Sequence, residues 1–264
     1  MTTESQNRTE LKFDVSLSVF FPCYNEEGNV ERVARRAAEV LAGLVREWEI
    51  ILVNDGSKDR TGEIADRLAR EVPGIRAAHH EKNSGYGAAL RTGFKSATKE
   101  YVFFTDGDGQ FDIAEIEKLL ELRDQADIIS GYRAHRQDNF MRRLNAACWG
   151  KLVRWMLSFK CRDVDCAFKL FKRRMFDGMV LKSTGALINA EILGRAARMG
   201  YTLKSIPVTH LPRIAGQQTG AKFSVIFRAF KELRRLRKDI RKTPKGTGNQ
   251  WEVIGERESV NSNR

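Results

Sequence analysis

Short apolar runs alternate with amphipathic helical patterns through the first half of the chain, and this alternation most limits the folds open to it. Strands are predicted at residues 15–21, 49–53, 75–79, 101–105 and 127–130. A strand, a helix and a second strand in this order form a right-handed parallel crossover. We therefore expect an α/β fold with three layers, built on a parallel sheet.

Helical patterns fill the spaces between these strands, at residues 30–45, 61–70, 85–97 and 113–122, and Asn29 is placed to cap the first of them. The pattern after residue 133 is less regular and richer in Arg and Trp, and we interpret it as the second half of the same domain, which would bind a second substrate. We expect a disordered lead-in at 1–13, a single domain at 14–242 and a disordered tail at 243–264.

Three of the predicted strands end in polar loops, and such loops lie side by side at the carboxyl edge of a parallel sheet. Asp106 and Asp108 follow the fourth strand two residues apart, so in extended backbone both carboxylates face the same way. Hard divalent cations prefer oxygen ligands, and Gln110 adds a neutral one. The alternative is a solvated acidic turn, in which Asp and Gly are also favoured.

Three segments together resemble the signature segments of family 2 glycosyltransferases, and within that family the dolichyl-phosphate mannose synthase-like branch. They are Pro22-Cys23-Tyr24-Asn25-Glu26-Glu27, Val53-Asn54-Asp55-Gly56-Ser57 and Thr105-Asp106-Gly107-Asp108-Gly109-Gln110. The similarity covers roughly residues 16–235. It implies a GT-A (Rossmann-like) fold, an inverting transfer and a nucleotide-diphosphate sugar donor, either a GDP- or a UDP-hexose.

The resemblance also implies roles for residues of the donor site. The nucleoside pocket would be lined by Pro22, Tyr24 and Glu26, and Asp55 would hydrogen-bond the base or the ribose. Mg²⁺ or Mn²⁺ would be held with the donor phosphates by Asp106, Asp108 and Gln110. A cation there stabilises the charge that develops on the leaving diphosphate, which gives Asp108 a catalytic role.

The acceptor implied by the resemblance is a polyprenyl (dolichyl or undecaprenyl) phosphate. A phosphate is already anionic at neutral pH, so it needs cations to hold it and no general base. The family's acceptor arginines have counterparts in Arg133 and Arg213, with Arg143 as a third candidate. Each could instead be a solvated surface charge.

Acidic residues of the second half also match family positions. Asp163 and Asp165 precede Cys166-Ala167-Phe168-Lys169, and either would be the base if the acceptor were a hydroxyl; with a phosphate they would orient cations or the sugar. Glu191 is a further match. The sequence departs from the family at Phe111-Asp112, where Asp112 is expected to cap the next helix, and at residues 216–222, which leaves Lys222 in doubt as a phosphate ligand.

Residues 222–242 form a basic amphipathic helical pattern with nine basic and two acidic residues, a net charge of +7 out of +12 for the chain. Such a helix is typical of membrane-surface binders; the alternative is that its first half packs on the core and only its end is solvated. A second stripe runs from Trp149 to Phe159. With no signal core and no apolar run long enough to span a bilayer, we expect a cytoplasmic protein, peripheral on the inner face of the membrane.

Other functions remain open at this point. The main alternative is a glycosyltransferase whose acceptor is a soluble or cell-envelope hydroxyl. A nonenzymatic nucleic-acid binder would use the net charge of +12, but it leaves the acidic loops unexplained, so we expect no nucleic-acid partner. A nucleotidyltransferase would need a Gly-rich phosphate loop with Arg and Lys near the first strand, and the sequence has no such loop there.

Overall fold

The computed structural model describes residues 11–134, 140–212, 223–246 and 253–254. Its strands are β1 (Phe13–Cys23), β2 (Val45–Asn54), β3 (Ile75–His79), β4 (Tyr101–Thr105), β5 (Ile128–Arg133), β6 (Phe168–Lys172), β7 (Leu203–Val208) and β8 (Val253–Ile254). Its α-helices are α1 (Val30–Leu44), α2 (Thr61–Glu71), α3 (Tyr86–Ser96), α4 (Ile116–Glu121), α5 (Phe140–Leu157), α6 (Ile188–Arg198) and α7 (Phe223–Ile240). Short 3₁₀ turns cover Ile113–Glu115 and Arg173–Phe176.

One eight-stranded sheet organises the molecule, in the order β3-β2-β1-β4-β6-β5-β7-β8. Strands β1 to β4 are mutually parallel, and so are β5, β7 and β8. Strand β6 runs antiparallel to both of its neighbours, β4 and β5. The five strands predicted from the sequence, β1 to β5, therefore run in the same direction as expected, and β6, which the pattern does not predict, runs against them.

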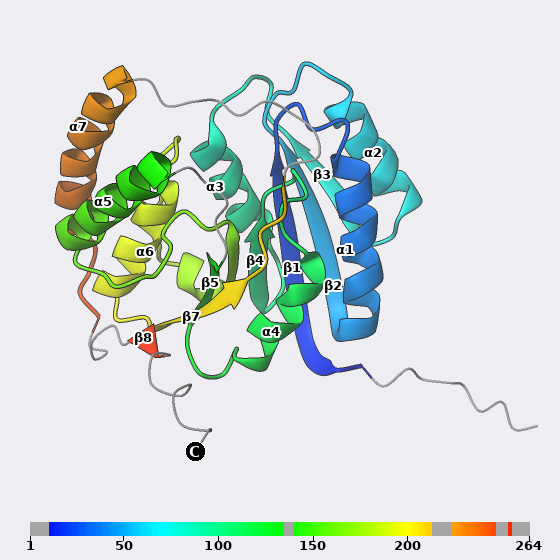
Figure 1. Ribbon diagram of the computed structural model, residues 1–264. Helices are drawn as coiled ribbons and strands as arrows, with labels where there is room; N and C mark the ends of the chain where they lie inside the picture. The colour runs from blue at the N-terminus through cyan, green and yellow to red at the C-terminus, as the bar shows by residue number, and fades with distance from the viewer. Residues whose placement is uncertain (1–10, 135–139, 213–222, 247–252, 255–264) are drawn as a thin grey trace, which may run out of the picture.

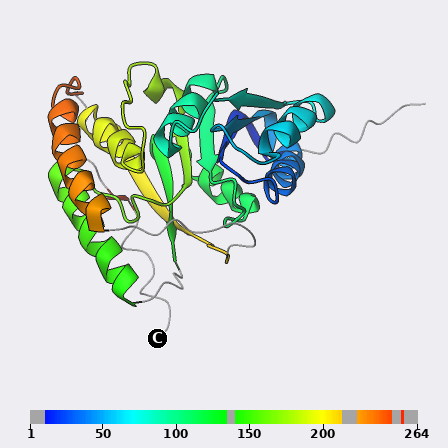
Figure 2. The ribbon, with the colours of Figure 1, turned by 90° about the horizontal axis from the view of Figure 1, so that it is seen from above.

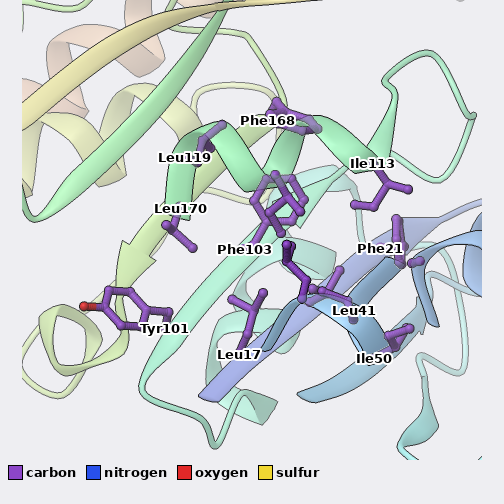
Figure 3. Close-up of a cluster of buried hydrophobic side chains, with 14 of the residues drawn as sticks. Leu17, Phe21, Leu41, Ile50, Tyr101, Phe103, Ile113, Leu119, Phe168 and Leu170 are labelled. Carbon is purple, nitrogen blue, oxygen red and sulfur yellow. The ribbon is translucent and has the colours of Figure 1, made fainter. Parts of the chain in front are cut away.

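Helices cover both faces of the sheet, which explains why β1 is buried without interruption from Leu17 to Cys23. Helices α1, α2 and α4 lie on one face and α3, α5, α6 and α7 on the other (Figure 1). Alternate residues of β1 point to opposite faces, so Leu17 and Phe21 enter the first core while Phe20 enters the second. Figure 3 shows the first core, where Leu41 of α1 meets the sheet and Phe103 packs edge-to-face with Phe168 at 4.7 Å between ring centroids.

Helix α3 lies unusually close to the sheet because Gly93 faces Phe20. A Cβ atom on Gly93 would lie 2.2 Å from the Phe20 ring, too close for any real contact. Phe20 is itself held by Phe94, edge-on at 4.9 Å, and by Phe104, stacked at 5.5 Å. The small residue at position 93 thus allows α3 to approach, and the N-terminus of α3 reaches the carboxyl edge of the sheet.

The predicted helices and strands of the first half are confirmed with small changes. Strands β3 and β4 have the predicted bounds, whereas β1 begins at Phe13 and continues through Pro22 to Cys23. Asn29 occupies the N-cap position of α1, but the predicted side-chain cap is absent, because its amide donates to Glu26 Oε2 at 2.8 Å. Asp112 caps the next turn as expected, accepting from the Ala114 amide at 3.1 Å.

The C-terminal tail was expected to be disordered from Thr243, and this is wrong for the residues that the structure describes there. Thr243 is buried, and its hydroxyl accepts a hydrogen bond of 2.7 Å from Arg195 Nη1 of α6. Further on, β8 pairs with β7 and adds the last strand to the sheet. The polar composition of the tail suggests disorder. The partners that order it lie about 50 positions earlier in the chain, so no local pattern reveals them.

Helices α5 and α7 lie side by side at one end of the molecule (Figure 2). In the part of α7 whose side chains are described, the apolar stripe faces the second core: Leu233, Leu236 and Ile240 are buried. The expectation that only the first half packs on the core is therefore wrong for the end of the stripe, and the side chains before Phe230 lie outside the described ones. Its basic residues face outward, next to the exposed Trp155 of α5.

Candidate functional site

The topology brings three polar loops to one edge of the sheet. Strands β1, β2 and β4 are parallel neighbours, so the loops that follow Cys23, Asn54 and Thr105 leave the sheet side by side. The first two are joined directly, since the Asp55 amide donates to the Cys23 carbonyl at 2.9 Å. The three segments that carry the family resemblance therefore lie together at this edge of the sheet.

The acidic loop after β4 holds two carboxylates close enough to repel each other. Asp108 is buried, and its Oδ1 accepts from the Gln110 amide at 3.1 Å. Burial, followed by the charge of Asp108, raises the pKa of Asp106 from its ordinary 3.8 to about 7. Tyr86 of α3 donates to Asp106 Oδ1 at 3.0 Å, and burial next to these charges raises the pKa of Tyr86 well above 10, so it remains a donor.

A divalent cation fits this loop. Two crowded carboxylates are a hard oxygen donor set with surplus negative charge. Just before them, and among the described residues, the buried hydroxyl oxygen of Thr105 has no hydrogen-bond partner. The same described part of the chain contains no group of three or more His, Cys, Asp or Glu side chains that could hold a metal alone. The remaining ligands would have to come from a bound molecule, such as a diphosphate.

Asp55 is a buried carboxylate that organises the loop before α3. Its Oδ1 accepts from the Ser84 amide at 2.8 Å, and its Oδ2 accepts from the Gly85 amide at 2.9 Å. His80 Nδ1 lies 2.7 Å from the same Oδ1, while its Nε2 lies 2.8 Å from Thr92 Oγ1. His80 thus positions a predicted donor-site residue, and no sequence signal links the two.

The predicted residues of the first loop differ in their exposure. Tyr24 is 41% exposed at the edge of the sheet, whereas Pro22 is buried inside β1. Asn25, directly after Tyr24, adopts a positive φ of 56° and accepts a hydrogen bond of 2.9 Å from the Lys58 amide through its side-chain oxygen. The Glu26 amide donates to Thr61 Oγ1 at 2.8 Å, so the loops after β1 and β2 are cross-linked.

Gln110 faces the end of β7 in addition to the acidic loop. Its side-chain amide donates to the Leu211 carbonyl at 3.2 Å, and the Leu211 amide donates to the Gln110 carbonyl at 2.7 Å. This contact brings the chain to the site two residues before Arg213. Arg213 itself lies outside the described residues, as do Lys222 and the side chain of Arg143.

Arg133, predicted to bind the acceptor, forms a two-pronged ion pair with Asp163. Its Nε and Nη2 lie 2.8 and 3.0 Å from the two carboxylate oxygens, and both side chains are largely buried. Burial opposes the charged guanidinium, but the Asp163 carboxylate outweighs it, so the pKa of Arg133 is raised. Asp165 is exposed, and its negative charge contributes to the raised pKa values of both Arg133 and Tyr86. The donor and acceptor halves of the predicted site therefore meet here.

Glu191 is fully buried, which fits neither a surface helix charge nor a residue that faces substrate. Its carboxylate accepts from the backbone amides of Lys182 and Ser183 and from Arg195 Nε at 2.8 Å. The segment that it holds packs on the start of α3, where the Gly87 amide donates to the Thr184 carbonyl at 2.8 Å. Glu191 thus fixes the segment at 182–184, and this segment in turn contacts the start of α3.

Two cavities border these loops. One of about 310 Å³ lies against the acidic loop and is lined by Thr105, Asp106, Arg32 and Leu211, among others. A larger one of about 590 Å³ lies along α3, and His80, Ser84 and Arg91 are among the residues that line it.

Among the helices that the structure describes, none is both long and apolar enough to cross a bilayer.

Comparison with known proteins gives consistent results. The model of glycosyl transferase family 2 matches residues 18–179. Glycosyltransferase AglD of Haloferax volcanii is 31% identical over 80% of this chain and 35% of its own length. An undecaprenyl-phosphate 4-deoxy-4-formamido-L-arabinose transferase of Pectobacterium atrosepticum is 30% identical over 62% of this chain and 51% of its own. The chain thus spans between about a third and a half of the length of these relatives.

Solved structures agree on the fold. Glucosyl-3-phosphoglycerate synthase from Mycobacterium tuberculosis in complex with phosphoglyceric acid superimposes with a TM-score of 0.63 and 16% identity, covering 88% of this chain and 81% of that one. The same enzyme in complex with Mn²⁺ and UDP-glucose gives a TM-score of 0.61, 16% identity and coverage of 88% and 80%. These likenesses confirm the GT-A fold that the sequence predicts.

Proposed function

The chain belongs to glycosyl transferase family 2, and from this premise we propose that it is a metal-dependent, inverting enzyme that moves a hexose from a nucleotide-diphosphate sugar to a polyprenyl phosphate. One observation carries the proposal: the acidic loop and the Arg133–Asp163 pair lie together at the carboxyl edge of the sheet. Residues 14–242 would form the catalytic unit.

On the donor side, the diphosphate would lie over the acidic loop. Asp106 and Asp108 would hold Mg²⁺ or Mn²⁺ together with the phosphates, and the Gln110 side chain would complete the ligands from the protein. When bound, the metal offsets the negative charge that builds on the leaving diphosphate. The nucleoside would occupy the exposed surface beside Tyr24, near Asp55, whose carboxylate is held in place by His80 and two backbone amides.

On the acceptor side, the guanidinium of Arg133 would orient the phosphate, with Arg213 as its partner from the segment after β7. A phosphate oxygen would attack the anomeric carbon as the bond to the donor β-phosphate breaks, and the nucleoside diphosphate would leave. The acceptor phosphate is already an anion, so no proton has to be removed from the nucleophile. Asp163 would then serve to align Arg133, and Asp165 to contact the sugar.

The membrane surface would meet the molecule at α5 and α7. We define the α5–α7 surface by exposed residues of both helices: Lys151, Trp155, Phe230, Arg234, Arg235 and Lys238. Trp155 is 72% exposed, with the Arg237 guanidinium 6.0 Å from its ring. Aromatic rings among cations match the interface of an anionic leaflet, where each Lys or Arg contributes about 1 kcal/mol. This would place the enzyme on the cytoplasmic face.

The test is transfer of labelled sugar by the purified chain. Donors would be UDP- and GDP-hexoses, with Mn²⁺ or Mg²⁺ or with EDTA, and acceptors would be undecaprenyl phosphate in anionic vesicles or a soluble hydroxyl acceptor such as phosphoglycerate. We expect metal-dependent label in the lipid fraction, lost in Asp108→Asn and reduced in Arg133→Ala. Label only in the soluble acceptor would favour the alternative of a hydroxyl acceptor, with Asp165 or Asp163 as base.

A vesicle-flotation measurement isolates the membrane step. Wild-type protein should float with vesicles that contain anionic lipid and remain behind with neutral ones. Reversing Arg234 and Arg235 to Glu should abolish flotation without loss of fold, whereas reversing Arg36 on α1, a similarly exposed cation on the other face, should not. Equal flotation of both variants would argue against the α5–α7 surface as the contact.

A further inference from the structure

Lys169 is a fully buried lysine on β6, only 1% exposed. It pairs in register with Phe104 of β4, one residue from the end of that strand and two from Asp106. Lysines are almost never buried so completely without partners, because an ammonium group loses its hydration there. The partners of Lys169 therefore indicate what the charge is for.

Its ammonium group joins two parts of the site. Nζ donates to the Val164 carbonyl at 3.1 Å and to the Cys166 carbonyl, which belong to the residues before and after Asp165. The turn that these bonds close also carries Asp163, the partner of Arg133. The same ammonium lies 5.8 Å from the centre of the Phe104 ring, beneath the end of β4.

Lys169 also lies near the acidic loop. Its partner in the register, Phe104, stands two residues before Asp106, on the strand that leads into that loop. One side chain thus contacts the turn of the acceptor half and lies beside the strand that carries the loop of the donor half. A completely buried ammonium is costly unless it is paired, so its charge is expected to act on the polar and charged groups that surround it.

We propose that Lys169 is a positioning residue, whose buried ammonium holds the turn 163–166, and with it the Arg133–Asp163 pair, against the acidic loop. This inference rests on the proposed function for its kinetic consequences. Lys169 touches neither substrate in this arrangement; it acts by fixing the distance between the donor and acceptor halves. Its loss should therefore affect the acceptor more than the donor.

The experiment compares Lys169→Met, which keeps the length but removes the charge and the donors, with Lys169→Arg, which keeps both. Lys172→Met is the matched control, because Lys172 lies on the same strand and pairs with Asp127 at 3.3 Å, away from the site. Each full-length variant is checked for folding by circular dichroism. Mn²⁺ affinity is measured by titration, and steady-state constants are measured for UDP-hexose and for undecaprenyl phosphate.

We expect Lys169→Met to remain folded, to lower kcat/KM for the acceptor about tenfold or more and to change KM for the donor less than about threefold, the loss expected for a displaced charge-assisted contact. Mn²⁺ should bind about threefold more tightly or better, because a nearby positive charge that repels it is gone. Lys169→Arg should recover at least part of the acceptor constant.

Three results would overturn the inference: Lys169→Met behaving like Lys172→Met, donor and acceptor constants falling by the same factor, or a folded Lys169→Arg protein with the full defect of Lys169→Met. If the wild-type protein transfers no sugar at all, the proposed function fails, and the Mn²⁺ titration then decides on Lys169 by itself. Unchanged Mn²⁺ affinity in Lys169→Met would in that case reject its link to the acidic loop.

Discussion

Replacing Asp106 by Asn should stabilise the metal-free protein at neutral pH, although it removes a proposed ligand. Burial and the neighbouring Asp108 raise the pKa of Asp106 from 3.8 to about 7, so its ionised form is disfavoured in the folded state. Asn is neutral at every pH and retains an oxygen that can accept the hydrogen bond from Tyr86. The variant therefore keeps the local contact and removes only the repulsion.

The sign and size follow from proton linkage. Between pH 3.8 and about 7 the folded state binds a proton at Asp106 that the unfolded state has released, so stability falls as pH rises through this window. The two pKa values differ by about three, and each tenfold change in proton affinity is worth about 1.4 kcal/mol, which gives roughly 4 kcal/mol at full ionisation. The free energy of unfolding of Asp106→Asn should exceed that of wild type by this order near pH 8, and by little near pH 4.

The assay is urea denaturation in EDTA at several values from about pH 5 to about pH 8, on wild type and Asp106→Asn. Asp112→Asn is the matched control, because it makes the same substitution at an exposed carboxylate of the same loop. Saturating Mn²⁺ should remove the advantage of Asp106→Asn, because bound metal stabilises the ionised wild-type loop. A wild-type-to-variant difference that stays constant from pH 5 to pH 8 would refute the reasoning.

Two further predictions concern packing and the donor loop. Gly93→Ala gains up to about 1 kcal/mol of helix propensity but places a methyl group 2.2 Å from the Phe20 ring, so we expect the free energy of unfolding in urea to fall by about 1–2 kcal/mol. Gly43→Ala, with open space around it, is the control and should gain stability. A stabilised Gly93→Ala would contradict the close approach of α3. His80→Ala removes a contact that fixes the Asp55 carboxylate, so KM for the donor should rise about tenfold with a smaller change in kcat, and an unchanged donor KM would show that the backbone amides hold Asp55 alone.

The sequence predicts well whatever depends on neighbours along the chain. Strands β3 and β4 are apolar runs that end at polar turns, and their bounds follow from that pattern alone. That Asp55, Asp106 and Asp108 lie at one edge of the sheet also follows from the sequence, because each comes directly after a strand and these strands are parallel.

Contacts between distant residues are where prediction from the sequence fails. His80 lies 25 positions from Asp55, and Thr243 lies 48 from Arg195, so no local pattern relates either pair. Lys169 occurs within a segment that resembles the family, yet a lysine between apolar residues reads as a solvated charge. Only the position of β6 in the middle of the sheet shows that its ammonium is buried.

The direction of β6 decides whether the two halves of the site can meet. Because β6 is antiparallel to β4, its first residue, Phe168, pairs with Thr105, the last residue of β4. The turn 163–166 precedes β6 and therefore lies beside the acidic loop, with Asp163 and Arg133 in reach of Asp106. A parallel β6 would carry this turn to the opposite edge of the sheet, a strand length away. The one strand direction that the alternating pattern does not predict is thus the feature that joins donor and acceptor residues separated by about 60 positions in the chain.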